Sequence, residues 1–220
     1  MPEVAANSKS ELIGGQGSCY PSSMLSLRRA LSQVTLPGPK LPHEFLCTLR
    51  RLGVVPSRFA LTVSVASQSM LLFKRTLNTQ HSTLNYSFRQ RYRISTSAYG
   101  LGQEADSDHT PLGLHRIAMK VGGGWPIGTV FRSRKPVGFT WQGLPKAPIV
   151  HRILWLEGLE PGYNRGGDVD TFKRYIYIHG FGDESTLGRP QSHGCIHLAA
   201  DDLIPLYDFV PTGTLVWIAL

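Results

Sequence analysis

The sequence predicts a mainly β protein, with one main domain that follows an N-terminal extension. Short apolar runs with alternating side chains recur from residue 59 to the end of the chain, and a period of two is typical of strands buried on one face. The 23 glycines and 15 prolines lie scattered between these runs, which indicates many turns. A chain of 220 residues, 41% of them hydrophobic, can bury one sizeable core.

We expect the extension to cover residues 1–55 and the main domain to cover residues 56–220. Residues 1–42 are rich in serine, glycine and proline, which favours loose order around one short amphipathic helix at 24–31. A second short helix is predicted at 43–52, because apolar residues recur there at helical spacing and a glycine follows as a stop.

The strands and one further helix follow in order. Two alternating runs at 61–73 surround a polar turn and predict a β-hairpin. A long polar loop is expected at 102–113, and a helix at 201–210 begins with two aspartates, where the helix dipole favours anions. The other predicted strands lie at 91–97, 114–121, 128–131, 149–156, 173–180 and 214–220.

Residues 192–198 read SHGCIHL and set a thiol between two imidazoles. On a strand, the period of two would put His193, Cys195 and His197 on one face. Such a face suits a zinc site, with His179 as a fourth ligand, or an activated nucleophile, since both need a deprotonated sulfur near nitrogen bases. Alternate strand positions are roughly 6.5 to 7 Å apart, so three of them converge on one ion only if the strand bends.

A nucleophilic cysteine needs a base and amide donors at the place where an oxyanion forms. Gly194 lets substrate and backbone approach closely, so the amides of Gly194 and Cys195 are candidate oxyanion donors. His179 ends the apolar run YIYI, 16 residues before Cys195. Two strand ends joined by such an excursion can be neighbours in a sheet, which would bring His179 to the sulfur. The alternative for Cys195 is an inert buried thiol, the usual fate of a strand cysteine.

At these residues the chain resembles the YkuD-type L,D-transpeptidases. The similar segments are IHG, SHGCI, an acidic helix start and a closing GTLVWI, with YRISTSAYGLGQ, HTPLGLHRI and RGGDVDTFKRYIYIHG upstream. The resemblance covers roughly residues 58–220 and implies a β-sandwich with a short helix after the catalytic cysteine. Two departures are visible: the interval from His179 to Ser192 is a little shorter than in the family pattern, and His197 stands where the family has Arg or Asn.

The resemblance also implies the residues of the site. Cys195 would be the nucleophile, and His179 would be the base that lowers the pKa of the thiol, oriented by the Gly180 carbonyl. The remaining implied roles are the lining of the site by His193, the shaping of the turn by Ser192 and Gly194, and contact with substrate by His197 and Tyr177. An arginine would be charged at all pH values whereas an imidazole is not, so we expect His197→Arg to preserve or raise turnover above neutral pH.

The implied reaction is an acyl transfer on peptidoglycan stem peptides or muropeptides. The thiolate would attack the carbonyl of the third stem residue, a diamino acid, and expel the terminal D-alanine. Transfer to a second diamino-acid amine gives a cross-link, whereas transfer to water makes the enzyme an L,D-carboxypeptidase that trims tetrapeptides in recycling. A third hypothesis is a non-catalytic wall-binding homologue. No cofactor or metal is expected, and carbapenem-type inhibitors are expected to acylate the cysteine.

The formal net charge of +8 and the isoelectric point near 9.6 would suit a polyanion. No basic stripe interleaved with aromatics, as a nucleic-acid site would have, is visible along the chain. The densest cationic stretches, at 89–93 and 132–135, are interpreted as solvated faces beside predicted strands. An acidic wall polymer or a carboxylate-bearing peptide would use the same charge. Cys19 and Cys47 could pair only in an oxidising compartment, and a buried free thiol is the expectation for Cys47.

No apolar run approaches the roughly 18 residues of a membrane span, and the first twenty residues lack the pattern of a secretory signal. The sequence as given therefore predicts a cytoplasmic location. A periplasmic or envelope location would follow from a misassigned start.

Overall fold

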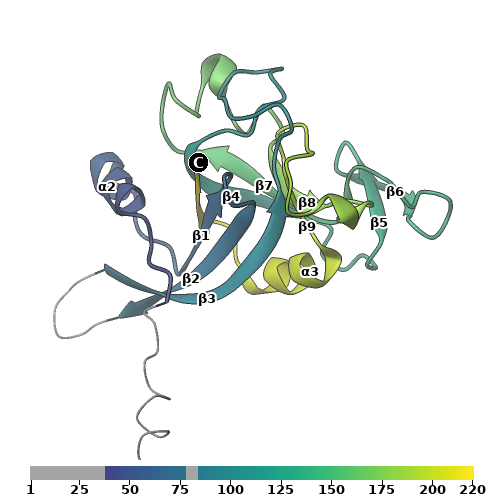
Figure 1. The fold of residues 1–220 in the computed structure, drawn as a ribbon, viewed down its shortest axis with the longest axis horizontal. Helices are drawn as coiled ribbons and strands as arrows, with labels where there is room; N and C mark the ends of the chain where they lie inside the picture. The colour runs from purple at the N-terminus through teal and green to yellow at the C-terminus, as the bar shows by residue number, and fades with distance from the viewer. Residues whose placement is uncertain (1–37, 78–83) are drawn as a thin grey trace, which may run out of the picture. The chain divides into compact units, whose positions relative to one another are not determined.

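The computed structural model describes residues 38–77 and 84–220 (Figure 1). The helix predicted at 24–31 and the cysteine at position 19 lie outside these residues. The described helices are α2 (His43–Leu52), η2 (Gly167–Val169), η3 (Glu184–Thr186) and α3 (Ala200–Phe209). The described strands are β1 (Phe59–Ser64), β2 (Ser69–Leu77), β3 (Leu84–Ser95), β4 (Gly113–Val121), β5 (Thr129–Arg132), β6 (Lys135–Phe139), β7 (Val150–Gly158), β8 (Tyr177–Gly180), β9 (Ile196–Leu198) and β10 (Leu215–Ala219).

The strands form one sheet that closes on itself. They pair in the order β4-β10-β1-β2-β3-β9-β8-β7-β5-β6, and β4 also pairs with β7. This last pairing joins all strands except β5 and β6 into a ring, from which the β5–β6 hairpin extends beside β7 (Figure 1). The predicted mainly β class, with a short helix after the cysteine, is confirmed.

The main core lies between the strands of the ring and α3. Alternating residues of β1 and their neighbours across β2 point inward, which explains why the hairpin predicted at 61–73 forms. From α3, the apolar residues Leu203, Leu206 and Tyr207 cover this core. The fully buried members include Leu61, Met70, Ile94, Ile117, Leu154, Leu156, Ile178, Ile196 and Leu203. The inward side chains of β7, β8 and β9 are members of this core, so close packing fixes the position of the strands beside the candidate site.

Helix α2 has the bounds that the sequence predicts. It ends at Gly53, which has a left-handed φ of 63° and donates its amide to the carbonyl of Arg50. Its apolar face buries Phe45 and Leu49 in a second cluster that includes Phe73 of β2. The helix thus packs on the strands of the main domain, and the division of the chain at residue 55 stays a prediction.

The structure corrects two predicted strands. The strand expected at 173–180 begins only at Tyr177, because Tyr175 adopts a φ of 57°, which ends any extended backbone. The SHGCIHL segment is a strand only from Ile196, since Gly194 has a φ of 105°. His193, Cys195 and His197 therefore do not share one strand face.

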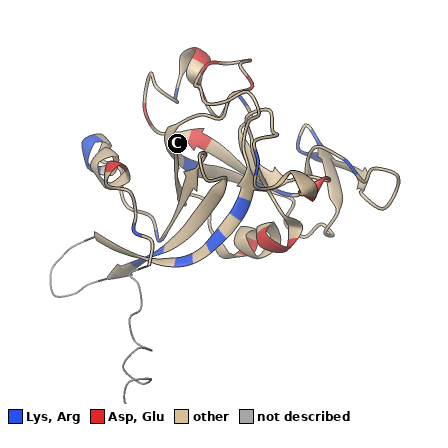
Figure 2. Cartoon of the chain, viewed as in Figure 1, with Lys and Arg blue, Asp and Glu red and all other residues tan. Residues whose placement is uncertain are grey.

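Surface charge agrees with only part of the prediction for the cationic stretches. Arg89, Arg91 and Arg93 are exposed on β3, where Figure 2 shows a row of basic residues. In the other stretch Arg132 is exposed but Arg134 is half-buried.

Cys47, which the sequence predicted as a buried free thiol, is exposed, because it lies on the outer face of α2 beside His43.

Candidate active site

The candidate nucleophile, Cys195, follows a turn that is fixed by two hydroxyl groups. The Ser192 hydroxyl donates a hydrogen bond of 2.6 Å to the Cys195 carbonyl oxygen. The Thr110 hydroxyl, which is buried, donates one of 3.0 Å to the Gly194 carbonyl oxygen and accepts the Ser97 amide. These bonds hold the turn in the left-handed conformation that Gly194 permits.

Cys195 is half-buried beside β8 and packs against an aromatic cluster formed by Phe131, Trp155, Phe172 and Tyr177. Its sulfur accepts a hydrogen bond from the Tyr177 amide at 3.4 Å and donates one to the Tyr175 carbonyl at 3.5 Å. Burial raises the pKa of the thiol to about 11, although the Tyr177 amide and the Arg174 charge act in the opposite direction. Without substrate, Cys195 is therefore a neutral thiol at pH 7, which is the opposite of the lowered pKa that we expected.

The candidate base, His179, lies on β8 next to the strand that follows the nucleophile. Strands β8 and β9 are parallel, with His179 paired to His197. Cys195 is two residues before His197, so it lies diagonally from His179 across this pairing and beside Tyr177, whose amide donates to its sulfur. No strand pairing bonds Cys195 itself, because β9 begins at Ile196.

The proton of His179 is assigned by its surroundings. Its Nδ1 lies 2.8 Å from the Gly180 carbonyl oxygen, and a carbonyl only accepts, so Nδ1 carries the proton and Nε2 is left as an acceptor. Burial lowers the pKa of this imidazole to about 4, which keeps it neutral at pH 7. A side chain on Gly180 would collide with the ring of His151 and the carbonyl of Val150.

His197 is buried behind His179. Its ring stacks on Phe181 at a centroid distance of 4.5 Å and meets His179 edge-on at 4.8 Å. Its Nδ1 is buried without a hydrogen-bond partner among the described residues. Burial, with the nearby imidazoles of His179 and His193, lowers its pKa to about 3. A neutral, buried ring is poorly suited to replace the arginine of the family pattern as a cation.

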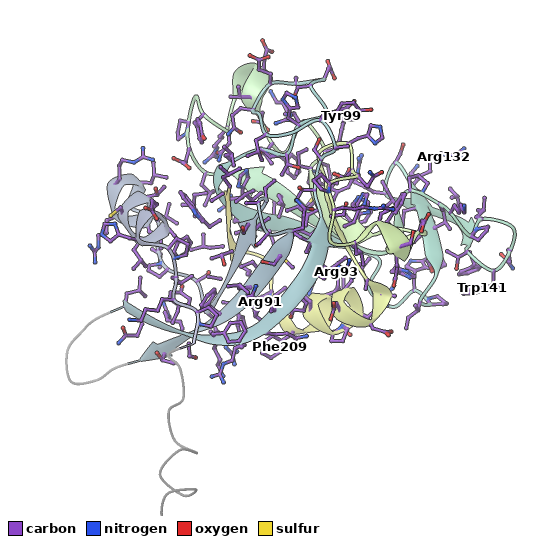
Figure 3. All side chains as sticks on the ribbon, in the orientation of Figure 1. Arg91, Arg93, Tyr99, Arg132, Trp141 and Phe209 are labelled. Carbon is purple, nitrogen blue, oxygen red and sulfur yellow. The ribbon has the colours of Figure 1, made fainter. Side chains whose placement is uncertain are left out.

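His193 and Tyr177 occupy different surroundings. The ring of His193 is exposed and contacts Tyr99, which Figure 3 labels, at a centroid distance of 5.3 Å. Tyr177 is only 4% exposed. Its phenol faces the half-buried Arg134, which donates a hydrogen bond of 3.2 Å to the hydroxyl.

A cavity of about 340 Å³ is lined by His193 of the SHGC turn and by the residues before β8, but by neither Cys195 nor His179. Its lining includes His193, Arg174, Tyr175, Ile176, Asp106 and Asp108. The thiol contacts this wall through the Tyr175 carbonyl. Arg174 also holds the loop at 102–113, because its guanidinium donates to the carbonyls of Gln103 and His109 at 2.9 and 2.7 Å. The polar loop predicted at 102–113 thus contributes two carboxylates, Asp106 and Asp108, to the cavity.

No group of three or more His, Cys, Asp or Glu among residues 38–77 and 84–220 is arranged to hold a metal ion. In the same residues, no helix is both long and apolar enough to cross a membrane.

The family model of the YkuD L,D-transpeptidase catalytic domain matches residues 58–218. The chain belongs to this family. The match runs from just before β1 into β10 and contains all of the site residues named in this section. It confirms the resemblance carried by the IHG and SHGCI segments. No curated protein matches the chain.

Solved structures similar to this YkuD domain include three with low identity. An L,D-transpeptidase from Mycobacterium smegmatis is 13% identical with a TM-score of 0.42, and covers 74% of this chain and 59% of its own. Bd1075 from Bdellovibrio bacteriovorus is 16% identical with a TM-score of 0.46, over 74% and 48%. L,D-transpeptidase 3 from Mycobacterium tuberculosis, in complex with a faropenem-derived adduct, is 16% identical with a TM-score of 0.42, over 74% and 60%. The chain thus spans about half to three fifths of these proteins.

Sequence reasoning on the YkuD domain missed three residues that shape the site. Thr110 fixes the turn before the nucleophile, Arg174 braces the cavity wall, and Arg134 contacts the aromatic cluster. Thr110 lies in the HTPLG segment that carried part of the resemblance, so its position was visible but its contact was not. No spacing in the sequence signals the two arginines, because their partners are distant in the chain.

Proposed function

We propose that the domain is a cysteine acyltransferase that acts on peptidoglycan stem peptides. Cys195 attacks the carbonyl of the third stem residue, and Nε2 of His179 takes the thiol proton. The tetrahedral intermediate collapses as its C–N bond breaks, and His179 returns the proton to the leaving D-alanine amine. The amine of a second diamino acid then attacks the thioester, passes a proton to His179 and releases the sulfur.

The single observation that carries this proposal is the arrangement of His179. Its Nδ1–H is held by the Gly180 carbonyl, which leaves Nε2 free to accept a proton on the strand beside the nucleophile. This is the orientation that a general base needs. The role assigned to the Gly180 carbonyl is therefore supported by a direct contact.

The two amides of the turn support a role in stabilising the oxyanion. The N–H groups of Gly194 and Cys195 donate no backbone hydrogen bond within the part of the chain that the structure describes. The Gly194 carbonyl, which the Thr110 hydroxyl fixes, shares its peptide plane with the Cys195 amide, so this amide is oriented before substrate arrives. Preorganised donors stabilise a developing oxyanion more than mobile ones do.

The protonation states of Cys195 and His179 in the free enzyme determine when the proton is transferred. A thiol with a raised pKa and an imidazole with a lowered pKa are both neutral at pH 7, so no thiolate–imidazolium pair exists beforehand. Proton transfer to His179 therefore accompanies or follows substrate binding, when attack by the sulfur makes the thiol more acidic.

Incubation with a disaccharide-tetrapeptide tests the proposal. We expect a cross-linked dimer, free D-alanine and an acyl-enzyme mass adduct on Cys195, all absent from Cys195→Ala. Tripeptide without dimer would instead establish the L,D-carboxypeptidase. Absence of both products and of any adduct, with peptide still bound, would establish the wall-binding homologue. A carbapenem adduct on Cys195 would independently show an accessible, acylable thiol.

A further inference from the structure

Arg134 lies at the tip of the β5–β6 hairpin on a rigid aromatic platform. Its guanidinium carbon is 4.6 Å from the ring centroid of Trp155 and 4.9 Å from that of Tyr175. Trp155 is itself fixed, because it stacks on Phe172 at 4.0 Å and its indole N–H donates to the Phe172 carbonyl at 3.0 Å. The platform therefore holds the cation in one place.

The backbone of the hairpin is strained at this residue. Ser133 and Arg134 both adopt left-handed φ values of 47° and 66°, as a two-residue turn between paired Arg132 and Lys135 requires. Glycine or asparagine is the usual residue in such a turn, and an arginine there costs conformational energy. The contacts of the side chain with the platform offset this cost.

Tyr177 connects this guanidinium to the nucleophile. Its hydroxyl accepts a hydrogen bond of 3.2 Å from Nη1 of Arg134, while its amide donates to the sulfur of Cys195. The guanidinium and the sulfur thus contact opposite ends of the same tyrosine, and Tyr175 also contacts both, through its ring and its carbonyl. When the reacting carbonyl lies at the sulfur, a carboxylate on the leaving residue or at the end of a diamino-acid side chain extends away from it and is placed to meet Arg134.

The guanidinium of Arg134 has donors to spare. A guanidinium carries five N–H groups, and Arg134 forms no ion pair with a carboxylate among residues 38–77 and 84–220. His197, which stands at the position of the family's arginine, is buried with a neutral ring. Arg174 already uses its guanidinium to hold the carbonyls of Gln103 and His109. A half-buried, stacked and unpaired arginine has the geometry for a planar two-oxygen acceptor.

We propose that Arg134 binds a carboxylate of the stem peptide and so selects substrates with a free carboxylate on the leaving residue or on the side chain of the third residue. The inference rests on the proposed function and names the substrate group that the site recognises. That group is either the carboxylate of the leaving D-alanine or the second carboxylate of a diaminopimelate-type third residue. Both offer the same two oxygens to the guanidinium fork, and amidated peptides distinguish them.

The experiment compares four variants on three peptides. Arg134→Gln removes the charge, Arg134→Lys keeps the charge without the planar fork, and Arg134→Gly suits the left-handed turn and so keeps the hairpin folded. Arg132→Gln is the matched control, because Arg132 (Figure 3) lies on the same hairpin and is exposed. The peptides are the free acid, the C-terminal amide and the peptide amidated at the third residue.

For the free acid, kcat/KM should fall roughly 10- to 100-fold in Arg134→Gln and Arg134→Gly, mainly through KM. Arg134→Lys should lose less, and Arg132→Gln should match wild type. On the peptide whose amide replaces the bound carboxylate, wild type and Arg134→Gln should be equal. Equal losses on all three peptides would overturn the proposal and leave Arg134 a support of the platform. Equal activity of Arg134→Gln and wild type on the free acid would overturn it too.

Failure of the proposed function gives a different result. In that case wild type itself forms no acyl-enzyme with any peptide, and both proposals fall together. Wild-type turnover combined with an unaffected Arg134→Gln overturns only the role of Arg134. Thermal unfolding of each variant reports whether the hairpin substitutions change folding.

Discussion

The backbone amide of Tyr177 donates a hydrogen bond to the sulfur of Cys195 across 3.4 Å. The bond arises because β8 and β9 are parallel neighbours, so that the first residue of β8 lies beside the residue before β9. The same alignment sets His179 diagonally from Cys195. The nucleophile is thus held by a contact with the neighbouring strand β8 and not by a partner close to it in the sequence.

Alkylation of Cys195 should become faster with pH well above neutrality. Iodoacetamide reacts with the thiolate, and burial raises the pKa of this thiol to about 11. In a Cys19→Ser, Cys47→Ser background, the rate should rise about tenfold per pH unit between pH 7 and pH 10. A rate that levels off below pH 8 would show that a thiolate exists before substrate binds.

The hydroxyl of Thr110 should matter more than its size. It donates to the Gly194 carbonyl and accepts the Ser97 amide, and both bonds are buried. Thr110→Val keeps the shape but leaves both groups unsatisfied, so the free energy of unfolding should fall by about 1–3 kcal/mol. Turnover should fall as well, because the turn before Cys195 loses its support.

Thr110→Ser is the matched control, since it retains the hydroxyl. It should keep most of the stability and turnover, measured by urea denaturation and by acyl-enzyme formation. Equal loss in both variants would contradict the assignment, because Thr110→Ser retains the hydroxyl that Thr110→Val lacks.

Acid should destabilise the fold through its buried imidazoles. Burial lowers the pKa of His115 and His179 to about 4 and that of His197 to about 3, against about 6.5 in an unfolded chain. Between these values the unfolded state binds more protons than the folded state, so the free energy of unfolding falls as pH is lowered from about 6.5 towards 4.

His115→Gln should weaken this dependence without touching the candidate site. His115 is bonded at Nδ1 to the Gly113 carbonyl and at Nε2 to the Thr171 hydroxyl. Removing one such group should reduce the slope of unfolding free energy by up to about 1.4 kcal/mol per pH unit. Urea denaturation at pH 5, 6 and 7 measures the slope, and an unchanged slope would contradict the assignment.

The burial of His197 changes what its substitution should do. An arginine there would place a guanidinium against Phe181 and His179, so His197→Arg should lower the free energy of unfolding by about 2 kcal/mol or more. His197→Phe keeps the stacking and removes the unpartnered Nδ1, so stability should be equal or higher. The turnover of His197→Phe decides the role of the ring: a loss of about tenfold, near 1.4 kcal/mol in barrier, would assign it a part in catalysis.

Local patterns predicted most of the fold. Helix α2 has its predicted bounds because apolar spacing and a following glycine define it within ten residues. The strand at 173–180 was predicted too long, because a run of aromatic residues resembles a strand even when Tyr175 takes a left-handed φ. A backbone reversal at a residue other than glycine has little signal in the sequence.

The sequence by itself determined the mainly β class, the family resemblance and the candidate pair Cys195 and His179, because short motifs and a period of two record local chemistry. Only the tertiary structure decided the burial of His197, the neutral state of the resting thiol and the position of Arg134 on Trp155 and Tyr175. Burial and long-range contact depend on which strands become neighbours. That choice is made by the packing of the whole sheet around one core, so no short stretch of the chain contains it.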